Sequence, residues 1–533
     1  MTTRPLGAQI SHMLKMRGVD TIFGIPGVHN VEMYRGIEEA GITHVLARHE
    51  QGAGFMADGY ARATGRPGVA YVITGPGLCN IMTPMGQAYS DSVPMLVISS
   101  CLDETAATRG QLHQMLDQRA AADTVCDWSH EARTATAAYT LIDRALTEFE
   151  TDRPRPKHMQ VPIALLGDRA EEAPATPPAR ATPPQSPDLS EIARALNAAR
   201  KPLFIFGGGL ARSGKTDATA DLARETLRLS GAAAFMTYAG VGLLAGDDPQ
   251  SFGTYLARGE SVKYIAQSDL VIAIGTELSE CDLWRDDLGH TGPLIRVDID
   301  AEVLVDRHRA ETVVQMDGAA FLTGLLPHLT PRDSQWDAAD IAAAKHRWKA
   351  ETDSDRPGIV AICDALAAVM PGETMVYSDM TQFAYVAREV WDMPRPGHWH
   401  HPAGFGTLGY ALPAAIGGAV ARSGLGLPTL AIAGDYGFQY TVQDLGTAVE
   451  LGLSLPILLW DNAKLKEIED SMVRSQIAPN AVVARNPDFL ALARAYGAEA
   501  VEPGSFADLQ QAVLDAFDAD RPTLIRITPA LTA

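Results

Sequence analysis

The chain has 533 residues, of which 46% are hydrophobic and 20% charged, a balance typical of soluble globular proteins and unlike that of disordered chains. One hydrophobic core does not serve a chain of this length, so we expect three domains. The formal net charge of −21 argues against nucleic-acid binding, which needs basic patches. Binding of an anionic small molecule is still compatible with this net charge, since local basic groups or a bound cation can override it at a site.

The sequence predicts neither a membrane protein nor a secreted one. No apolar run reaches the length of a membrane span, and residues 1–5 lead directly into an amphipathic helix rather than a signal-peptide core. The five cysteines are scattered, odd in number and without CxxC spacing, so neither a disulfide framework nor a zinc site is expected. We therefore expect a cytoplasmic protein without a membrane partner.

Short apolar runs rich in β-branched residues alternate with helical patterns along the chain, which is typical of parallel α/β sheets. We place a first domain at residues 1–170, with a helix that opens near Gln51. Its expected buried strands are residues 21–24, 42–46, 69–74 and 95–99.

Residues 171–187 are rich in Ala, Pro and Thr, a composition typical of an extended linker. A central α/β domain is expected at residues 188–329 and a charged, helical connection at 330–357. The last domain, residues 358–533, again alternates strands and helices. The fold prediction is therefore an α/β protein of three doubly wound parallel-sheet domains, with the first and third of the same general class. Expected strands of the last two domains include residues 203–206, 270–274, 294–300, 375–379, 429–433 and 455–460.

Two motifs in the last domain follow neighbouring strands. Gly434 and Asp435 end one strand, and Asn462 ends the next, 462 − 435 = 27 positions later. Ligands of open parallel sheets bind beyond the carboxyl ends of strands, and a carboxylate there, with a helix expected to begin near Thr441, suits a divalent cation that holds a diphosphate. Asn462 and the carbonyl of Lys464 would add oxygen ligands, which favours Mg²⁺. Taken singly, the motifs also fit a turn and a helix cap, but their joint spacing favours the metal site.

Together these motifs resemble the thiamine diphosphate motif of the acetolactate synthase and 2-oxo acid decarboxylase superfamily. The resemblance covers nearly the whole chain. It implies thiamine diphosphate and Mg²⁺ as cofactors and a pyrimidine-binding, a central and a diphosphate-binding domain in that order. Gly434, Tyr436 and Leu465 would border the cofactor beside the metal ligands. Tyr436 departs from the pattern, because many members have a small residue there, but both side-chain metal ligands are kept.

By the same resemblance, a glycine-interrupted segment at residues 404–413 supports the bent shape of the cofactor. The carbonyl of Gly406 would accept a hydrogen bond from the 4′-amino group, and Leu408 would be the bulky wedge under the thiazolium ring. Alternatively, Leu408 is a core leucine and the glycines serve turns. The bound cofactor supplies the electron sink, and the protein supplies orientation and electrostatics.

Glu50, which follows the strand at residues 42–46, resembles the family's glutamate that bonds N1′ of the aminopyrimidine and promotes general acid/base catalysis through the ring. An ion pair with Arg48 is the alternative interpretation. Glu50 and the metal motif lie in different terminal domains. In this family the two ends of one cofactor are held by domains of two subunits, which implies a homodimer or a homotetramer with active sites between subunits.

Further residues are expected to face the pyrimidine or the substrate. Gly75 and Asn80 resemble the loop that borders the pyrimidine, with Asn80 at a helix start, although a capped turn fits equally. His113 lies where relatives place polar active-site groups, and an imidazole can assist protonation of the enamine that remains after CO₂ leaves or hold the substrate carboxylate. A purely structural histidine is the alternative. Val28 is a further residue expected near the substrate.

Glu467 and Glu469 lie on an acidic helix that follows Asn462. Because they are two positions apart they do not share one helical face, so at most one points inward. We favour Glu467, whose carboxylate would suit a cationic substrate tail. A solvated helix face is the alternative.

The segments 23–29, 48–62 and 112–118 look most like the 5-guanidino-2-oxopentanoate decarboxylase branch of the family. The expected reaction is non-oxidative decarboxylation of this or a similar polar 2-oxo acid to an aldehyde and CO₂. One alternative is an acetolactate synthase-like carboligase. Such relatives often carry FAD in the central domain, but the glycines at residues 207–209 and 275 are weak evidence for a nucleotide and we expect no FAD. The other alternative, a catalytically silent cofactor-binding regulatory protein, is disfavoured by Glu50.

Overall fold

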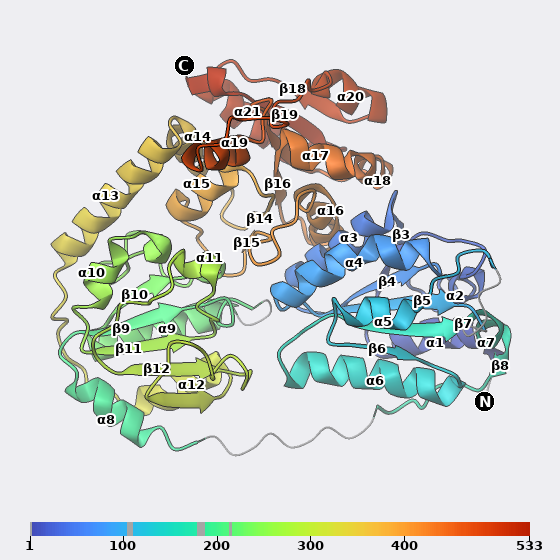
Figure 1. The fold of residues 1–533 in the computed structure, drawn as a ribbon, viewed down its shortest axis with the longest axis horizontal. Coiled ribbons are helices and arrows are strands. Elements are labelled where there is room, and N and C mark those ends of the chain that lie inside the picture. Colours follow the sequence, from blue (N-terminus) through green and yellow to red (C-terminus); the bar gives the residue numbers. More distant parts are fainter. Residues whose placement is uncertain (1–2, 104–109, 178–186, 213–215, 533) are drawn as a thin grey trace.

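The protein is described by a computed structural model that covers residues 3–103, 110–177, 187–212 and 216–532 and contains three α/β domains (Figure 1). The first domain is a six-stranded parallel sheet of order β3-β2-β4-β5-β7-β6. Its strands are β2 (Thr21–Gly24), β3 (Thr43–Leu46), β4 (Gly68–Val72), β5 (Met95–Cys101), β6 (Trp128–Glu131) and β7 (Lys157–Pro162). Its helices are α1 (Leu6–Met16), α2 (Val31–Tyr34), α3 (Glu50–Thr64), α4 (Pro76–Ser90), α5 (Gln118–Asp123), α6 (Ala135–Thr151) and α7 (Ile163–Gly167).

The central domain is a five-stranded parallel sheet of order β10-β9-β11-β12-β13. Its strands are β9 (Pro202–Phe206), β10 (Ala233–Met236), β11 (Leu270–Ile274), β12 (Leu294–Asp298) and β13 (Thr312–Gln315). Its helices are α8 (Ser190–Ala198), α9 (Thr216–Ser230), α10 (Ser261–Ile265), α11 (Glu280–Leu283) and α12 (Gly318–Leu325), and α13 (Ala338–Asp355) leads on to the third domain.

The third domain is a parallel sheet of order β15-β14-β16-β17-β19-β18, so its strands are arranged as in the first domain. The prediction of three parallel-sheet domains, with the first and third alike, is confirmed. The strands are β14 (Met375–Ser378), β15 (Trp399–His400), β16 (Thr429–Gly434), β17 (Pro456–Trp460), β18 (Glu499–Val501) and β19 (Thr523–Ile527). The helices are α14 (Ile359–Ala367), α15 (Gln382–Val390), α16 (Ala411–Arg422), α17 (Asp435–Thr441), α18 (Leu445–Glu450), α19 (Lys466–Arg474), α20 (Phe489–Tyr496) and α21 (Phe506–Phe517).

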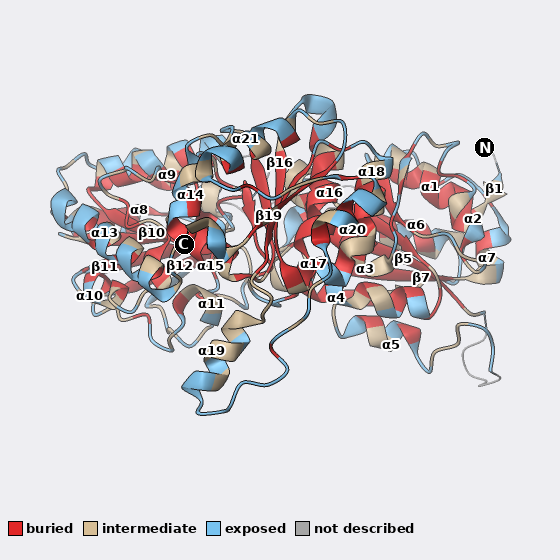
Figure 2. Ribbon diagram, turned by 90° about the horizontal axis from the view of Figure 1, so that it is seen from above, coloured by how far each residue is buried: buried red, intermediate tan, exposed pale blue. Residues whose placement is uncertain are grey.

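The central strands are buried on both faces, which explains why they read as continuous apolar runs (Figure 2). One hydrophobic cluster extends from the first domain into the third, where α3 packs on α16. Glycines allow this close approach: a Cβ at Gly59 would lie 1.9 Å from the carbonyl oxygen of Ala414, and a Cβ at Gly417 would lie 1.9 Å from that of Met56. The two terminal domains of one chain are therefore packed as one unit.

One expected boundary is wrong. The helix predicted to begin near Thr441 begins six residues earlier, at Asp435, where an extended Gly434 precedes α17. The negative charge of Asp435 in the first turn favours this start, because a helix N-terminus carries partial positive charge.

The remaining expectations concern the chain ends and connections. Residues 1–2 and 178–186 lie outside the described residues, the latter within the expected linker 171–187; the expected domain limits stay a proposal. Across the described residues no helix is long and apolar enough to span a membrane.

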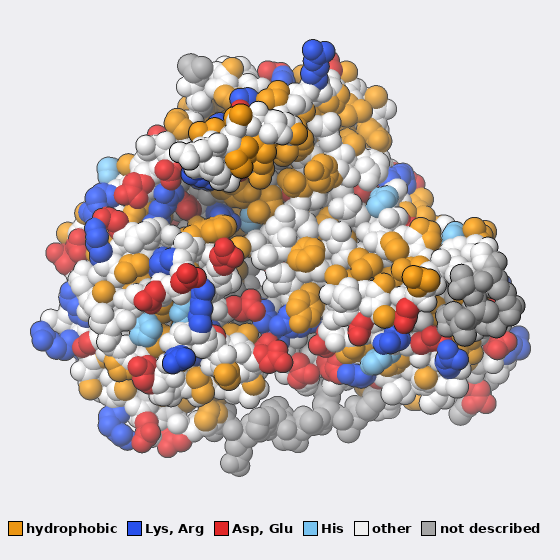
Figure 3. Space-filling view, in the orientation of Figure 1, with side chains coloured by type: hydrophobic (Ala, Val, Ile, Leu, Met, Phe, Trp, Pro, Cys, Tyr) orange, Lys and Arg blue, Asp and Glu red, His pale blue; other side chains and the backbone are white. Residues whose placement is uncertain are grey.

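On the face shown in Figure 3, basic side chains are scattered among acidic ones. The net charge of the chain is −21.

Candidate active site

The carboxyl end of β16 presents a buried carboxylate. Asp435 Oδ1 accepts a hydrogen bond from the backbone N–H of Tyr436 at 3.0 Å, and its Oδ2 accepts one from Asn486 Nδ2 at 2.7 Å. The same amide nitrogen donates to Asp461 Oδ1 at 2.8 Å. Burial, reinforced by the nearby charge of Asp461 and opposed by the Asn486 hydrogen bond, raises the pKa of Asp435. Two carboxylates thus share one amide at a place suited to a cation.

Asn462 lies at the end of the neighbouring strand β17. Its Oδ1 accepts the backbone N–H of Lys464 at 3.1 Å, and its Nδ2 donates to Gln382 Oε1 at 3.4 Å. The Lys464 side chain pairs with Glu469 at 2.9 Å, so a metal contact from this residue would have to come from its carbonyl.

The donor set fits Mg²⁺ rather than a transition metal. Within the described residues, no group of three or more His, Cys, Asp or Glu side chains is arranged to hold a metal ion. A cation here would take one carboxylate, the amide oxygen of Asn462 and a backbone carbonyl, and phosphate oxygens would have to complete its shell. That is the coordination Mg²⁺ usually has beside bound phosphates.

The predicted cofactor loop before α16 is held by a buried acid. Gly406 is exposed with φ of 68°, and a Cβ there would meet only the Met380 methyl group, at 3.7 Å. Leu408 is half-buried. Asp379 Oδ2 accepts the N–H of Gly409 at 2.9 Å, and burial, opposed by backbone hydrogen bonds, raises its pKa to about 7. Sequence reasoning missed Asp379, although it ends a strand just as Asp435 does.

In the first domain, Glu50 is the first residue of α3. His49 caps the helix, with Nδ1 accepting the N–H of Gln51 at 3.2 Å. Glu50 Oε2 accepts a hydrogen bond from Asn80 Nδ2 at 2.8 Å. Arg48 pairs with Glu450 of the third domain instead, so the alternative interpretation of Glu50 as its ion-pair partner is not supported.

Gly75 and Asn80 lie beside this carboxylate, but Asn80 is not at the helix start. Gly75, with φ of 71°, precedes Pro76, whose fixed φ suits the first helical position, so Asn80 falls one turn inside α4. A Cβ at Gly75 would lie 2.4 Å from the carbonyl oxygen of His113, which requires glycine there. The Gly75 N–H donates to Gln118 Oε1 at 2.8 Å.

His113 adopts φ of 63° and its ring meets that of His29 edge to face, with ring centroids 4.7 Å apart. Among the described residues the Nδ1 atoms of both rings are buried without a hydrogen-bond partner. Burial, then the neighbouring His113, lowers the pKa of His29. Sequence reasoning named the adjacent Val28, whose side chain is exposed, and missed His29; the signal was its place in the same loop.

Glu467 lies in the first turn of α19, whose N-cap residue is Leu465. Its carboxylate accepts hydrogen bonds from Arg356 and from Gln382, two residues that sequence reasoning missed. Burial would raise the pKa of Glu467, but these hydrogen bonds outweigh it and the pKa is lowered. Glu469 instead pairs with lysines of its own segment, so Glu467 is the residue that faces the metal motif, by way of Gln382.

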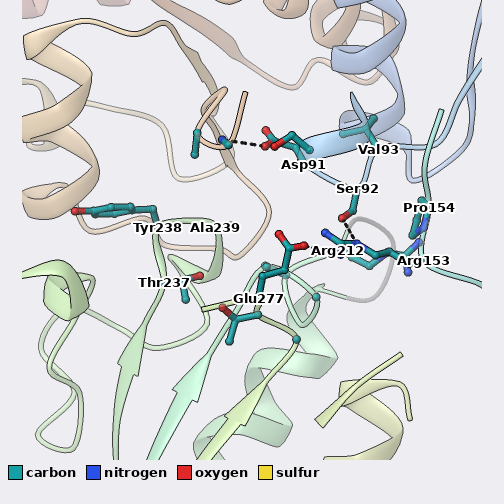
Figure 4. Close-up of a pocket in the computed structure, with 18 of the residues that line it drawn as sticks. Asp91, Ser92, Val93, Arg153, Pro154, Arg212, Thr237, Tyr238, Ala239 and Glu277 are labelled. Carbon is teal, nitrogen blue, oxygen red and sulfur yellow. Dashed lines mark hydrogen bonds and ion pairs between the residues drawn. The ribbon is translucent and has the colours of Figure 1, made fainter. Parts of the chain in front are cut away.

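A cavity of about 480 Å³ lies where the three domains meet (Figure 4). The glycine-ended strands of the central domain, at Gly208, Gly209 and Gly275, line it together with Glu277. Arg153 from the first domain pairs with Glu277 across it at 2.7 Å. The strand ends considered for a nucleotide thus face this cavity; the expectation that no FAD is bound stays a prediction.

Within one chain, Glu50 and the Gly406 loop contact opposite ends of α4. A Cβ at Gly77 would lie 3.4 Å from Glu50 Oε1, whereas a Cβ at Gly86 would lie 2.6 Å from the ring of Phe405, next to Gly406. These glycines are nine residues apart, which is about 13 Å of helix. Glu50 and Phe405 of the same chain therefore contact α4 at points about 13 Å apart.

Comparison with known proteins identifies similar proteins for each of the three domains. Three family models match: "Thiamine pyrophosphate enzyme, N-terminal TPP binding domain" at residues 4–121, the "central domain" at 189–325 and the "C-terminal TPP binding domain" at 379–527. The chain is 42% identical over 542 residues to the "Probable 2-ketoarginine decarboxylase AruI" of Pseudomonas aeruginosa, which covers 99% of this chain and 94% of that protein. It is 29% identical over 532 residues to the acetolactate synthase isozyme 2 large subunit of Escherichia coli, covering 98% and 95%.

Proposed function

We propose that this chain, which belongs to the thiamine pyrophosphate enzyme family, removes CO₂ from a 2-oxo acid whose side chain ends in a guanidinium group. The relative that shares 42% of its residues is named a probable 2-ketoarginine decarboxylase, whereas the acetolactate synthases are more distant. The observation that supports a guanidino substrate is the carboxylate of Glu467. It binds the guanidinium group of Arg356 and is linked to Asn462 through Gln382. The products would be CO₂ and the guanidino aldehyde.

At the pyrimidine end, Glu50 would share a proton with a ring nitrogen through Oε1, because Oε2 is engaged by Asn80. The carbonyl of Gly406 would orient the ring amino group, and Leu408 would support the bent cofactor. Bound thiamine diphosphate supplies the electron sink for the pair of electrons left when CO₂ departs. His113, with His29 against it, would deliver the proton to the former carboxyl-bearing carbon.

At the diphosphate end, Asp435, Asn462 and the Lys464 carbonyl would hold Mg²⁺, with Gly434, Tyr436 and Leu465 beside the phosphates. The N-terminus of α17 adds partial positive charge for the same anion. The Asn486 amide bridges the carboxylates of Asp435 and Asp461 beside the proposed cation site.

We propose that each active site is shared by two chains, Glu50 from one and the Asp435 motif from the other. The separation of about 13 Å along α4 between the contacts of Glu50 and of the Gly406 loop, which belongs to the same domain as Asp435, supports this proposal. Mixing inactive Glu50→Gln and Asp435→Ala chains tests it. Mixed dimers form one intact and one doubly altered site, so about a quarter of the sites are active at equal mixing. No recovered activity would contradict the proposal.

The reaction is tested with the holoenzyme, Mg²⁺, thiamine diphosphate and a panel of 2-oxo acids, with CO₂ and the organic product followed together. Formation of 4-guanidinobutanal from 5-guanidino-2-oxopentanoate is the expected result. An acetohydroxy acid from pyruvate would favour the carboligase instead. No turnover over the whole panel would favour a silent cofactor-binding protein.

A further inference from the structure

Glu467 is already occupied by a guanidinium group of its own chain. Arg356 Nε lies 2.8 Å from Glu467 Oε1 and its Nη2 lies 3.1 Å from Oε2, so the pair is bidentate. This is the geometry in which a carboxylate recognises any guanidinium, whether it belongs to an arginine or to a free ligand.

The surroundings of the Arg356 guanidinium complete a recognition site for that group. Gln382 Nε2 donates to Glu467 Oε1 at 2.9 Å and so fixes the carboxylate. The ring of Tyr385 lies 5.5 Å from the guanidinium carbon, a distance at which an aromatic face attracts a cation. Gln382 also contacts Asn462 at 3.4 Å, which links this site to the proposed metal ligand.

The Arg356–Glu467 pair is built so that it can open. The two side chains keep 22% and 29% of their surface exposed, so a ligand in solution can reach the pair. Helix α19, which carries Glu467, has no buried residue and projects from the body of the protein (Figure 2). Arg356 is the C-cap residue of α13, so neither partner is fixed in the middle of a packed element.

Two further carboxylates lie near Arg356. Burial lowers the pKa of Arg356, but the contacts with Glu467 and then the charges of Glu389 and Asp355 raise it. Both of these acids also pair with Arg258, so a displaced Arg356 would share them with that arginine.

We propose that Arg356 is an internal stand-in for the substrate: the guanidinium tail of the bound 2-oxo acid displaces it and takes its bidentate place on Glu467. This inference rests on the proposed function and adds a specificity residue to it. An uncharged tail gains nothing from Glu467 and leaves Arg356 in place, and an ammonium tail lacks the planar fork that matches the carboxylate. The exchange would select guanidino acids from other 2-oxo acids of similar length.

Steady-state kinetics of the holoenzyme test the exchange with Arg356→Met. Removal of the competitor should lower the KM for 5-guanidino-2-oxopentanoate about fivefold with little change in kcat, the equivalent of about 1 kcal/mol. The KM for 2-oxohexanoate should not change. Glu467→Gln should raise the KM for the guanidino acid only, and Arg356→Lys should fall between wild type and Arg356→Met. Arg347→Met, an exposed arginine of the same helix α13, is the matched control.

Two outcomes would overturn the exchange while the proposed function stands. One is an unchanged or raised KM for the guanidino acid in folded Arg356→Met. The other is a selectivity between the two acids that Glu467→Gln does not alter.

Binding of ethylguanidine to the holoenzyme, measured by calorimetry, separates this inference from the proposed function. If the wild type turns over only uncharged 2-oxo acids, the proposed substrate is wrong. Tighter ethylguanidine binding by Arg356→Met than by wild type, lost in Arg356→Met with Glu467→Gln, would still support displacement at Glu467. Equal binding by all three proteins would overturn it.

Discussion

The first and third domains share one strand order but present different chemistry at the same places. In each, the second strand leads to a helix, α3 after β3 and α16 after β15, and these two equivalent helices pack on each other. Gly59 of α3 touches the backbone of Ala414, and Gly417 of α16 touches that of Met56. The scaffold is thus close to symmetric, with each helix supplying the small residue that the other requires.

The difference lies in what precedes or opens each helix. Helix α3 opens with the carboxylate of Glu50, whereas α16 follows the glycine loop of Gly406, which Asp379 holds by the N–H of Gly409. The third strands differ as well: β4 is followed by Gly75, and β16 by Asp435. In the proposed mechanism, the same fold would supply a proton-sharing acid from one domain and a backbone carbonyl with a metal ligand from the other.

The largest expected effect is on kcat, and it distinguishes the proposed acid of the first domain from the proposed metal ligand of the third. Glu50→Gln should lower kcat by a factor of about 10²–10⁴, the usual contribution of a general acid/base, while Mg²⁺-dependent binding of thiamine diphosphate is retained. Turnover assays and calorimetry measure the two quantities. Glu38→Gln, an exposed glutamate of the same domain, is the control. Full activity of Glu50→Gln would remove Glu50 from its proposed role.

Asp435→Ala should show the opposite pattern. Loss of the carboxylate at the end of β16 should weaken Mg²⁺-dependent cofactor binding at least about tenfold, so that activity returns only at high cofactor concentration. Titration calorimetry with thiamine diphosphate at fixed Mg²⁺ measures this. The exposed Asp515→Ala serves as a control in the same domain. Unchanged affinity would place the metal elsewhere.

The helix contact provides a third test, in which both domains should respond alike. Gly59→Ala and Gly417→Ala should each lower the free energy of unfolding by about 1–3 kcal/mol, because the added Cβ meets backbone atoms of the other helix. Urea unfolding measures the loss. Gly372→Ala is the control, since a Cβ there meets nothing within 4 Å. A loss in only one of the two variants would show that the contact is not reciprocal.

The smallest expected effect concerns Asp444, which joins the third domain to the first by accepting the N–H of Arg48 at 2.9 Å. Burial, opposed by this hydrogen bond, raises the pKa of Asp444 from 3.8 to about 7. Its carboxyl therefore holds a proton in the folded chain where the unfolded chain has lost it, so this group makes folding less favourable as pH rises from about 4 to 7.

Asp444→Asn removes that dependence. The stability of the variant relative to wild type should increase by about 1 kcal/mol between about pH 6 and pH 7 and level off above the folded pKa. Urea unfolding of both proteins across this range measures the difference. A difference that does not vary with pH would contradict the raised pKa.

Much of the fold could be predicted because its signals are local. The central strands are buried on both faces, so each shows as an apolar run, and the elements observed at residues 21–24, 270–274 and 456–460 lie where expected. The start of α17 was missed because Gly434 and Asp435 also fit a turn. Asn80 was misplaced for a similar reason: a glycine at positive φ let the helix begin at Pro76.

The contacts within the site were less predictable. Asn486, Gln382 and Arg356 reach the proposed metal and substrate residues only because distant segments fold back onto one another. No residue pattern near Asn462 predicts that these three residues contact the site. His29 is the exception, since it lies beside a residue already selected.

By itself, the sequence determined the chemistry available to this protein: Glu50 after one strand, Asp435 and Asn462 after two others, and glycines where the backbone must turn or approach closely. Those features depend on neighbours along the chain, and local sequence carries them. Only the tertiary structure decided which groups meet. Glu50 and the Gly406 loop contact α4 about 13 Å apart, and the C-cap residue of α13 meets the first turn of α19, which places Glu467 on Arg356. Such distances follow from packing between elements far apart in sequence.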